Sequence, residues 1–282
     1  MKKNLAIFIL ILCTTVLKAE LPDKDTLYMS PDDSVIFTKY ISYIKGYSGL
    51  PKDSIIIRTA KFFLGTPYVA HTLEIEPEGL VINLRELDCT TFVENVRVLT
   101  ATVMSGDFSF QNYCNLLKHF RYRSDTINDY TDRLHYTSDW IDENQSKGLI
   151  NNVTRKCGGK RLRLNLYIMS MNTDSYSQLA EKPELIEKVV ATEKAINARK
   201  HYYIPTKRIK RKSAKMHDGD VVGFVTTIPG IDISHVGIIY KEGKKVTFIH
   251  ASSANKKVII NESSLKDYVA GTGKNTGIVL AR

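Results

Sequence analysis

Apolar residues recur at helical spacing through the first third of the chain. The segment 20–50 is typical of a loop followed by one helix, and the segment 52–65 of a second helix that ends at Gly65. Residues 78–87 have the pattern of a short strand or hairpin. A further helix is expected directly behind Cys89, because apolar side chains again recur every three or four positions from there on.

The pattern changes after the middle of the chain. The segment 106–205 is predicted to be helical and rich in loops. Behind it come the short β-branched runs "GDVVGFVTT", "HVGIIYKEG", "KKVTFIHASS" and "KVIINES", with "KEGKK" as a hairpin loop between two of them. Helices first and an antiparallel sheet last indicate an α+β fold. No linker divides residues 20–282, so we expect one domain with a helical insertion at about 106–205.

The N-terminus has the three parts of a secretory signal peptide. Two lysines precede an apolar run, and Ala19 marks a cleavage site, so residues 1–19 are expected to be removed. Lipid attachment at Cys13 is the alternative, but Leu12 stands where a small residue is expected. No second apolar stretch of spanning length follows, which favours an exported, periplasmic protein without a membrane span.

The net charge of the chain indicates which class of molecule it binds. The chain carries a formal net charge of +10, and removing residues 1–19 takes away three lysines and no acid. For an exported protein this basic character favours anionic cell-wall polymers or their fragments over nucleic acid.

The cysteines left after cleavage are odd in number, so at least one thiol is unpaired within the chain. Cys114 and Cys157 either pair or are both buried and free, and no zinc-ligand spacing is present.

Cys89 stands at a predicted helix start, where the positive end of the helix dipole lowers a thiol pKa. A buried, inert thiol is the alternative. Two histidines favour the interpretation of Cys89 as a nucleophile over that of an inert thiol. His235 and His250 lie on strands joined by the "KEGKK" hairpin, and counting from that loop places both near the opposite end of the pair. A cysteine with two facing histidines has the composition of a nucleophile, a base and an orienting group.

The segments "LDCTTFVENV", "MHDGDVVGF", "SHVGIIY" and "FIHAS" resemble the successive motifs of the NlpC/P60 cell-wall peptidases, which are papain-like cysteine hydrolases. With "FFLGTPYVAHTLE" and "RLHYTSDW", nearly all of the mature chain is similar to the DUF1460 branch, described as N-acetylmuramoyl-L-alanine amidase-like. The resemblance implies a papain-like core in which the helix that carries the cysteine packs on an antiparallel sheet, with helical and loop insertions.

The resemblance also implies roles for particular residues. Cys89 would be the nucleophile and its backbone N–H an oxyanion donor, His235 the general base, and His250 the group that orients His235. Asn, Gln or Asp could also do this last job. Tyr68 matches an aromatic residue that lines the cleft in these enzymes, with a core tyrosine as the alternative.

Further candidates rest on weaker patterns. Asp88 is interpreted as the cap of the helix behind it. Ser234 is predicted to touch substrate or to cap a strand. Arg133, with His135 and Trp140, is predicted to form a wall for sugar or stem peptide, with a packed insertion as the alternative. The basic run 207–212 is typical of a solvated face.

These inferences predict an enzyme without cofactor or metal that acts on peptidoglycan or soluble muropeptide fragments, as a monomer. The resemblance implies hydrolysis of the N-acetylmuramoyl-L-alanine bond through a thioester on Cys89. The alternatives are a γ-D-glutamyl–diaminopimelate endopeptidase, a catalytically inactive wall-binding protein and a thiol acyltransferase.

Overall fold

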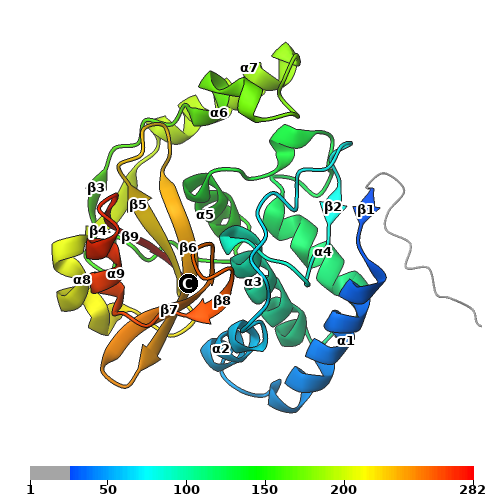
Figure 1. Ribbon diagram of the computed structural model, residues 1–282, viewed down its shortest axis with the longest axis vertical. Helices are drawn as coiled ribbons and strands as arrows, with labels where there is room; N and C mark the ends of the chain where they lie inside the picture. The colour runs from blue at the N-terminus through cyan, green and yellow to red at the C-terminus, as the bar shows by residue number, and fades with distance from the viewer. Residues whose placement is uncertain (1–25) are drawn as a thin grey trace, which may run out of the picture.

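The computed structural model describes residues 26–282, so the predicted signal peptide and Cys13 lie outside the described residues. An antiparallel seven-stranded sheet forms the centre of the fold (Figure 1). The α+β class expected from the sequence is confirmed. The strands follow the order β3 (Lys160–Leu162), β4 (His201–Pro205), β9 (Asn275–Ala281), β5 (Val221–Thr226), β6 (Ile233–Glu242), β7 (Lys245–Ser252) and β8 (Lys257–Ile260).

Four helices from the first half of the chain lie on one side of this sheet (Figure 1). The central helix, α3, packs against β6 and β7 and buries most of its apolar side chains, including Phe92, Val96 and Leu99. This burial is why apolar residues recur at helical spacing behind Cys89. The four are α1 (Pro31–Ile44), α2 (Lys52–Phe62), α3 (Cys89–Ser105) and α4 (Phe110–Arg121).

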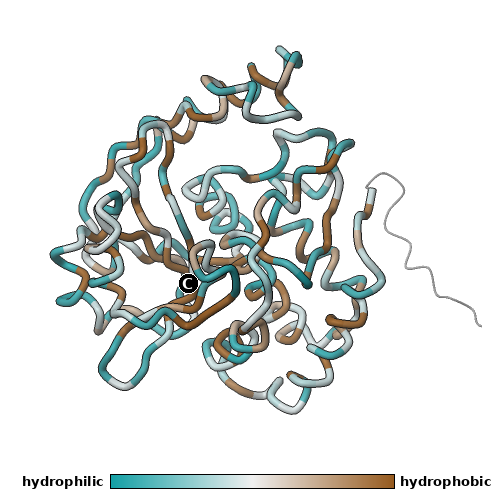
Figure 2. Tube along the Cα trace, viewed as in Figure 1, coloured by the Kyte–Doolittle hydropathy of each residue, from teal (hydrophilic) through white to brown (hydrophobic). Residues whose placement is uncertain are grey.

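The second helix ends three positions before the predicted Gly65, and residues 78–87 contain only one short strand. That strand, β2 (Leu80–Val81), pairs in parallel with β1 (Leu27–Tyr28). The predicted hairpin loop is confirmed, because β6 and β7 join through Gly243, whose φ of 59° suits glycine. This loop is hydrophilic, whereas the strands it joins are largely hydrophobic (Figure 2).

The middle of the chain is less purely helical than the sequence predicted, because it also supplies the strands β3 and β4 at one edge of the sheet. Its helical part has a small core of its own, which includes Tyr136, Met169 and Leu179. The helices and 3-10 turns here are η2 (Tyr130–Asp132), α5 (Thr137–Ser146), α6 (Ile168–Met171), η3 (Thr173–Ser175) and α7 (Pro183–Ala198); η1 (Lys45–Tyr47) follows α1.

Two short helices cover the other side of the sheet (Figure 1). They are α8 (Thr206–Lys212), followed by η4 (Ser213–Lys215), and α9 (Leu265–Gly271). The basic run 207–212 forms most of α8 and is largely exposed apart from the buried Ile209. Cys114 and Cys157 are both buried and free, so the pairing left open by the sequence is absent. Within residues 26–282, no helix is both long and apolar enough to cross a membrane.

Candidate active site

Cys89 is the first residue of α3, and its position is fixed by a capping box. The Asp88 carboxylate accepts a hydrogen bond from the Thr91 N–H at 2.7 Å, and the Asp88 N–H donates to the Thr91 hydroxyl at 2.9 Å. Asp88 is therefore the helix cap that the sequence indicated. Because a helix start leaves N–H groups without intrahelical acceptors, the backbone around Cys89 can donate to an oxyanion.

The environment of the Cys89 thiol differs from the expectation. Burial raises its pKa to about 11, and the negative charge of Asp88 acts in the same direction. The backbone N–H groups of Val236 and Thr90 face the sulfur and oppose this shift without overcoming it. The sequence predicted a pKa lowered by the helix start; at the half-buried thiol, loss of hydration and the charge of Asp88 act against this effect and give the raised pKa.

His235 and His250 meet on the neighbouring strands β6 and β7, as the hairpin count predicted. The Nε2 atom of His235 and the Nδ1 atom of His250 lie 2.6 Å apart, and the two rings meet edge to face. The His235 ring also stacks on Phe224, with 5.8 Å between centroids. Burial lowers the pKa of His235 to about 4 and that of His250 to about 3. Both imidazoles are therefore neutral near pH 7.

Cys89 and His235 line one cleft of about 620 Å³, which is within the usual range for small-molecule sites. Ser234 lines it as well, and the substrate contact expected for this residue stays a prediction. The opposite wall comes from the middle of the chain and is rich in aromatic and polar side chains. Its residues include Tyr130, His135, Tyr136, Tyr176 and Gln178.

Tyr68 is half-buried near Cys89 but is not among the residues that line this cleft. Burial raises the pKa of its phenol, and the charges of Cys89 and Asp88 add to the shift. The pKa of Tyr268, on α9, is raised in the same way, mainly by burial and further by the charge of Cys89. The Tyr268 ring also lies 6.1 Å from the His250 ring. No pattern in the sequence singled Tyr268 out.

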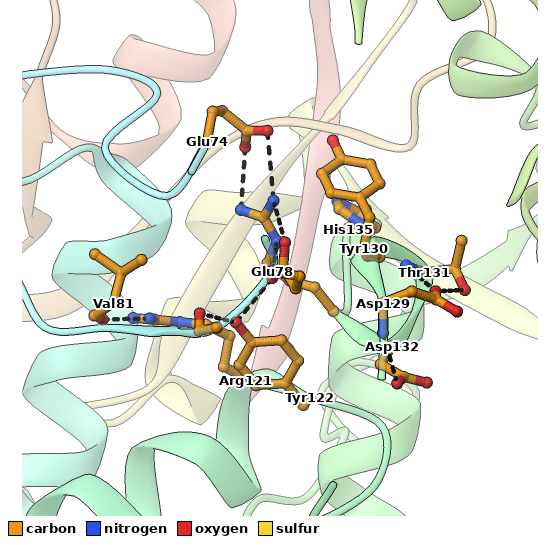
Figure 3. A network of polar contacts seen from close by, with 12 residues as sticks. Glu74, Glu78, Val81, Arg121, Tyr122, Asp129, Tyr130, Thr131, Asp132 and His135 are labelled. Atoms are coloured by element: carbon orange, nitrogen blue, oxygen red, sulfur yellow. Dashed lines mark hydrogen bonds and ion pairs between the residues drawn. The ribbon is translucent and has the colours of Figure 1, made fainter. Parts of the chain in front are cut away.

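Arg133 is not among the residues that line the cleft. Figure 3 shows its partners Glu74 and Glu78 in a network of polar contacts close to Tyr130. Its guanidinium is buried and bound to two carboxylates, with Nη1 donating to Glu74 at 3.0 Å and Nε lying 3.2 Å from Glu78. It also stacks over the Tyr130 ring. Glu74 and Tyr130 do line the cleft, so Arg133 supports the wall and its charge is already neutralised.

Trp140 is part of the core, packed edge to face on Phe120, and does not line the main cleft. His135 does line it, and its Nε2 lies 2.8 Å from the Tyr130 carbonyl oxygen. Of the predicted cluster of Arg133, His135 and Trp140, only His135 lines the cleft. Within residues 26–282, no group of three or more His, Cys, Asp or Glu side chains is placed to hold a metal ion.

Comparison with known proteins assigns the chain to a family. Residues 58–278 match the AmiA-like family, described as N-acetylmuramoyl-L-alanine amidase-like. A structure of an N-acetylmuramoyl-L-alanine amidase from Bacteroides uniformis is 34% identical, with a TM-score of 0.78 over 82% of this chain and 98% of that chain. A Bacteroides fragilis structure, whose name proposes a xylanase, is 33% identical, with a TM-score of 0.76 over 80% and 99%.

A Legionella pneumophila protein of the DUF1460 family shares the fold, with a TM-score of 0.65 and 20% identity over 89% of this chain and 93% of that chain. A comparison with curated protein sequences found no significant match. The family match spans most of the chain and includes Cys89, His235 and His250. The chain belongs to the AmiA-like family of N-acetylmuramoyl-L-alanine amidase-like proteins.

Proposed function

We propose that this protein is a cysteine amidase that hydrolyses the bond between N-acetylmuramic acid and L-alanine in peptidoglycan fragments. The observation that carries the proposal is the shared cleft: Cys89, at the start of α3, and His235, paired with His250, line the same cavity. The relatives named as amidases support the choice of bond. The proposal includes membership of the papain-like NlpC/P60 superfamily.

The contact between the two histidines supports a path for the Cys89 proton. A hydrogen bond donated by Nε2 of His235 to Nδ1 of His250 leaves Nδ1 of His235 as the nitrogen that can accept a proton. His235 then takes the Cys89 proton as sulfur attacks the amide carbonyl, and the oxyanion is held by the N–H groups at the start of α3. Because thiol and imidazole are both neutral at rest, proton transfer accompanies attack.

Breakdown of the tetrahedral adduct completes the first half-reaction. His235 gives its proton to the nitrogen of L-alanine as the C–N bond breaks, which leaves a thioester between Cys89 and the lactyl carbonyl of the muramic acid. His235 next removes a proton from water, and the resulting attack releases the glycan carboxylate and the Cys89 thiol. No cofactor takes part in this sequence. His250 holds the ring of His235 throughout.

The larger cleft suits the glycan half of the substrate. Tyr176 on its far wall offers an aromatic face, and Glu74 and Gln178 offer hydrogen-bonding groups, the combination that binds sugar rings. Arg133 and Trp140 are given no contact with substrate. The protein acts after export and removal of residues 1–19, in the periplasm, where muropeptides are available.

Digestion of defined muropeptides tests the proposal. Wild-type protein should release free disaccharide and intact stem peptide, as identified by mass spectrometry, and the Cys89→Ala variant should release neither. Disaccharide that still bears L-Ala-D-Glu would assign the γ-D-glutamyl–diaminopimelate bond instead. Binding without turnover by the wild type would assign a wall-binding protein, and transfer to an added amine would assign an acyltransferase.

A further inference from the structure

A second, smaller recess of about 300 Å³ lies beside the main cleft. Ser234 and His235 line both cavities, whereas Cys89 lines only the larger one. The recess also borders His250 and Tyr268, so it adjoins both rings of the histidine pair. Through Ser234 and His235 the recess is continuous with the lining of the cleft.

The chemistry of the cleavage indicates which half of the substrate would lie in the recess. The general acid must reach the nitrogen of the leaving amine, so the leaving half of the substrate lies against His235, and the acyl half stays attached to Cys89. A cavity that contains His235 and excludes Cys89 therefore takes the leaving half. For a muramoyl amide, this leaving half is the stem peptide.

Hydrogen-bond donors gather around the recess. If Nδ1 of His250 accepts from His235, the single ring proton of neutral His250 must lie on its Nε2, and this buried Nε2 has no partner among residues 26–282. The Ser252 hydroxyl oxygen already accepts bonds from the backbone and the side chain of Asn255, which leaves its proton available. Asn275 accepts from Ser234 through Oδ1, so its Nδ2 group is also available to donate.

Charge distinguishes the two cavities. Among the described residues that line the recess, Lys274 is the only Lys, Arg, Asp or Glu, and its side chain is exposed. The larger cleft is bordered by the carboxylates of Glu74, Asp174 and Asp232 and, within the described chain, by no lysine or arginine. Because Glu74 is already paired with Arg133, the difference between the cavities lies in Lys274, which offers a substrate carboxylate a cation that the described lining of the cleft does not offer.

We propose that the recess binds the free α-carboxylate of the second stem residue, D-glutamate, and so selects stem peptides in which this group is not amidated. The inference rests on the proposed function. Two extended residues span about 7 Å, which brings this carboxylate from the scissile nitrogen into a cavity adjoining His235. Lys274 supplies the charge, and the donors of Ser252 and Asn275 bind the oxygens.

The test compares two muramoyl tetrapeptides that differ only in D-glutamate or D-isoglutamine at the second position. Wild-type protein should cleave the D-glutamate substrate with a kcat/KM roughly tenfold higher, because a charge-assisted contact is lost with the amide. Lys274→Met should abolish the preference, and Lys274→Arg should keep it. The exposed Lys244, in the loop between β6 and β7, provides the matched control Lys244→Met, which should behave as wild type.

Each outcome has one meaning. Equal cleavage of both substrates at the muramoyl bond overturns the carboxylate subsite and leaves the proposed function intact. A preference that survives Lys274→Met also overturns it, because the charge would then come from elsewhere. Absence of cleavage at the muramoyl bond in both substrates refutes the proposed function, and the subsite proposal falls with it.

Discussion

The Nε2 atom of His235 lies 2.6 Å from the Nδ1 atom of His250. This contact joins two strands of the sheet and couples the tautomers of the two rings. Because burial keeps both rings neutral near pH 7, one ring must donate and the other accept. In the mechanism that we propose, His235 donates, and this leaves its other nitrogen to serve as the base for Cys89.

Replacement of His250 tests this assignment. His250→Phe removes the acceptor of the His235 proton, and we expect kcat to fall by roughly 10²-fold while KM changes little. His250→Gln offers an amide oxygen as acceptor and should retain more activity than the Phe variant. Steady-state kinetics of both variants give the comparison. Equal losses in the two would show that His250 acts only through packing.

The pH dependence of kcat/KM tests the neutral resting state. A base whose pKa is lowered to about 4 stays deprotonated, and hence active, well below the usual histidine range. Activity should therefore fall with decreasing pH only as the pH approaches about 4, as His235 becomes protonated. Circular dichroism at each pH identifies any loss caused by unfolding. An acidic limb near the ordinary histidine pKa, with the protein still folded, contradicts the assigned environment.

Asp88 has two effects on the thiol that can be separated. Asp88→Ser retains a cap for α3 but removes the negative charge that raises the pKa of Cys89. Alkylation of Cys89 by iodoacetamide at a fixed pH should become faster, by up to about the tenfold change that one pKa unit produces. Peptide mapping distinguishes Cys89 from the buried Cys114 and Cys157. An unchanged rate would show that the charge of Asp88 does not reach the sulfur.

The corresponding control is Asp88→Ala, which removes both the charge and the cap. It should lower the free energy of unfolding by about 1 kcal/mol, the usual cost of losing a helix cap. Asp88→Ser should be close to wild type in urea unfolding.

Arg133 is expected to matter for stability and not for substrate contact. Arg133→Met leaves Glu78 buried without its cation, and we expect the free energy of unfolding to drop by about 3–5 kcal/mol. The double variant Arg133→Met with Glu78→Gln removes the unpaired charge and should recover most of this loss. Urea unfolding measures both. If the double variant is as unstable as the single one, Glu78 is not the source of the cost.

The sequence was sufficient for those parts of the site that depend on local pattern. Helical spacing placed Cys89 at the start of a helix, and the hairpin loop brought His235 and His250 to one end of two strands. The burial of the thiol and the pairing of Arg133 with Glu74 and Glu78 depend on segments far apart in the chain, so no local pattern could reveal them.

Among the elements that the sequence analysis missed, α9 and β9 share a related reason. The helix α9 is only seven residues long, too short for a clear helical period, and it carries Tyr268 to the back of His250. The strand β9 contains Gly277 and follows a polar turn, which weakens its strand pattern. Its place between β4 and β5 in the middle of the sheet comes from pairing with distant strands.

Trapping the acyl-enzyme tests the central claim most directly. Protein quenched in acid during turnover of a disaccharide tetrapeptide can be digested and mapped by mass spectrometry. The account predicts a peptide containing Cys89 whose mass is increased by the disaccharide acyl group, with free tetrapeptide in solution. A stem-peptide fragment on Cys89, or turnover without any adduct that continues in Cys89→Ala, would contradict it.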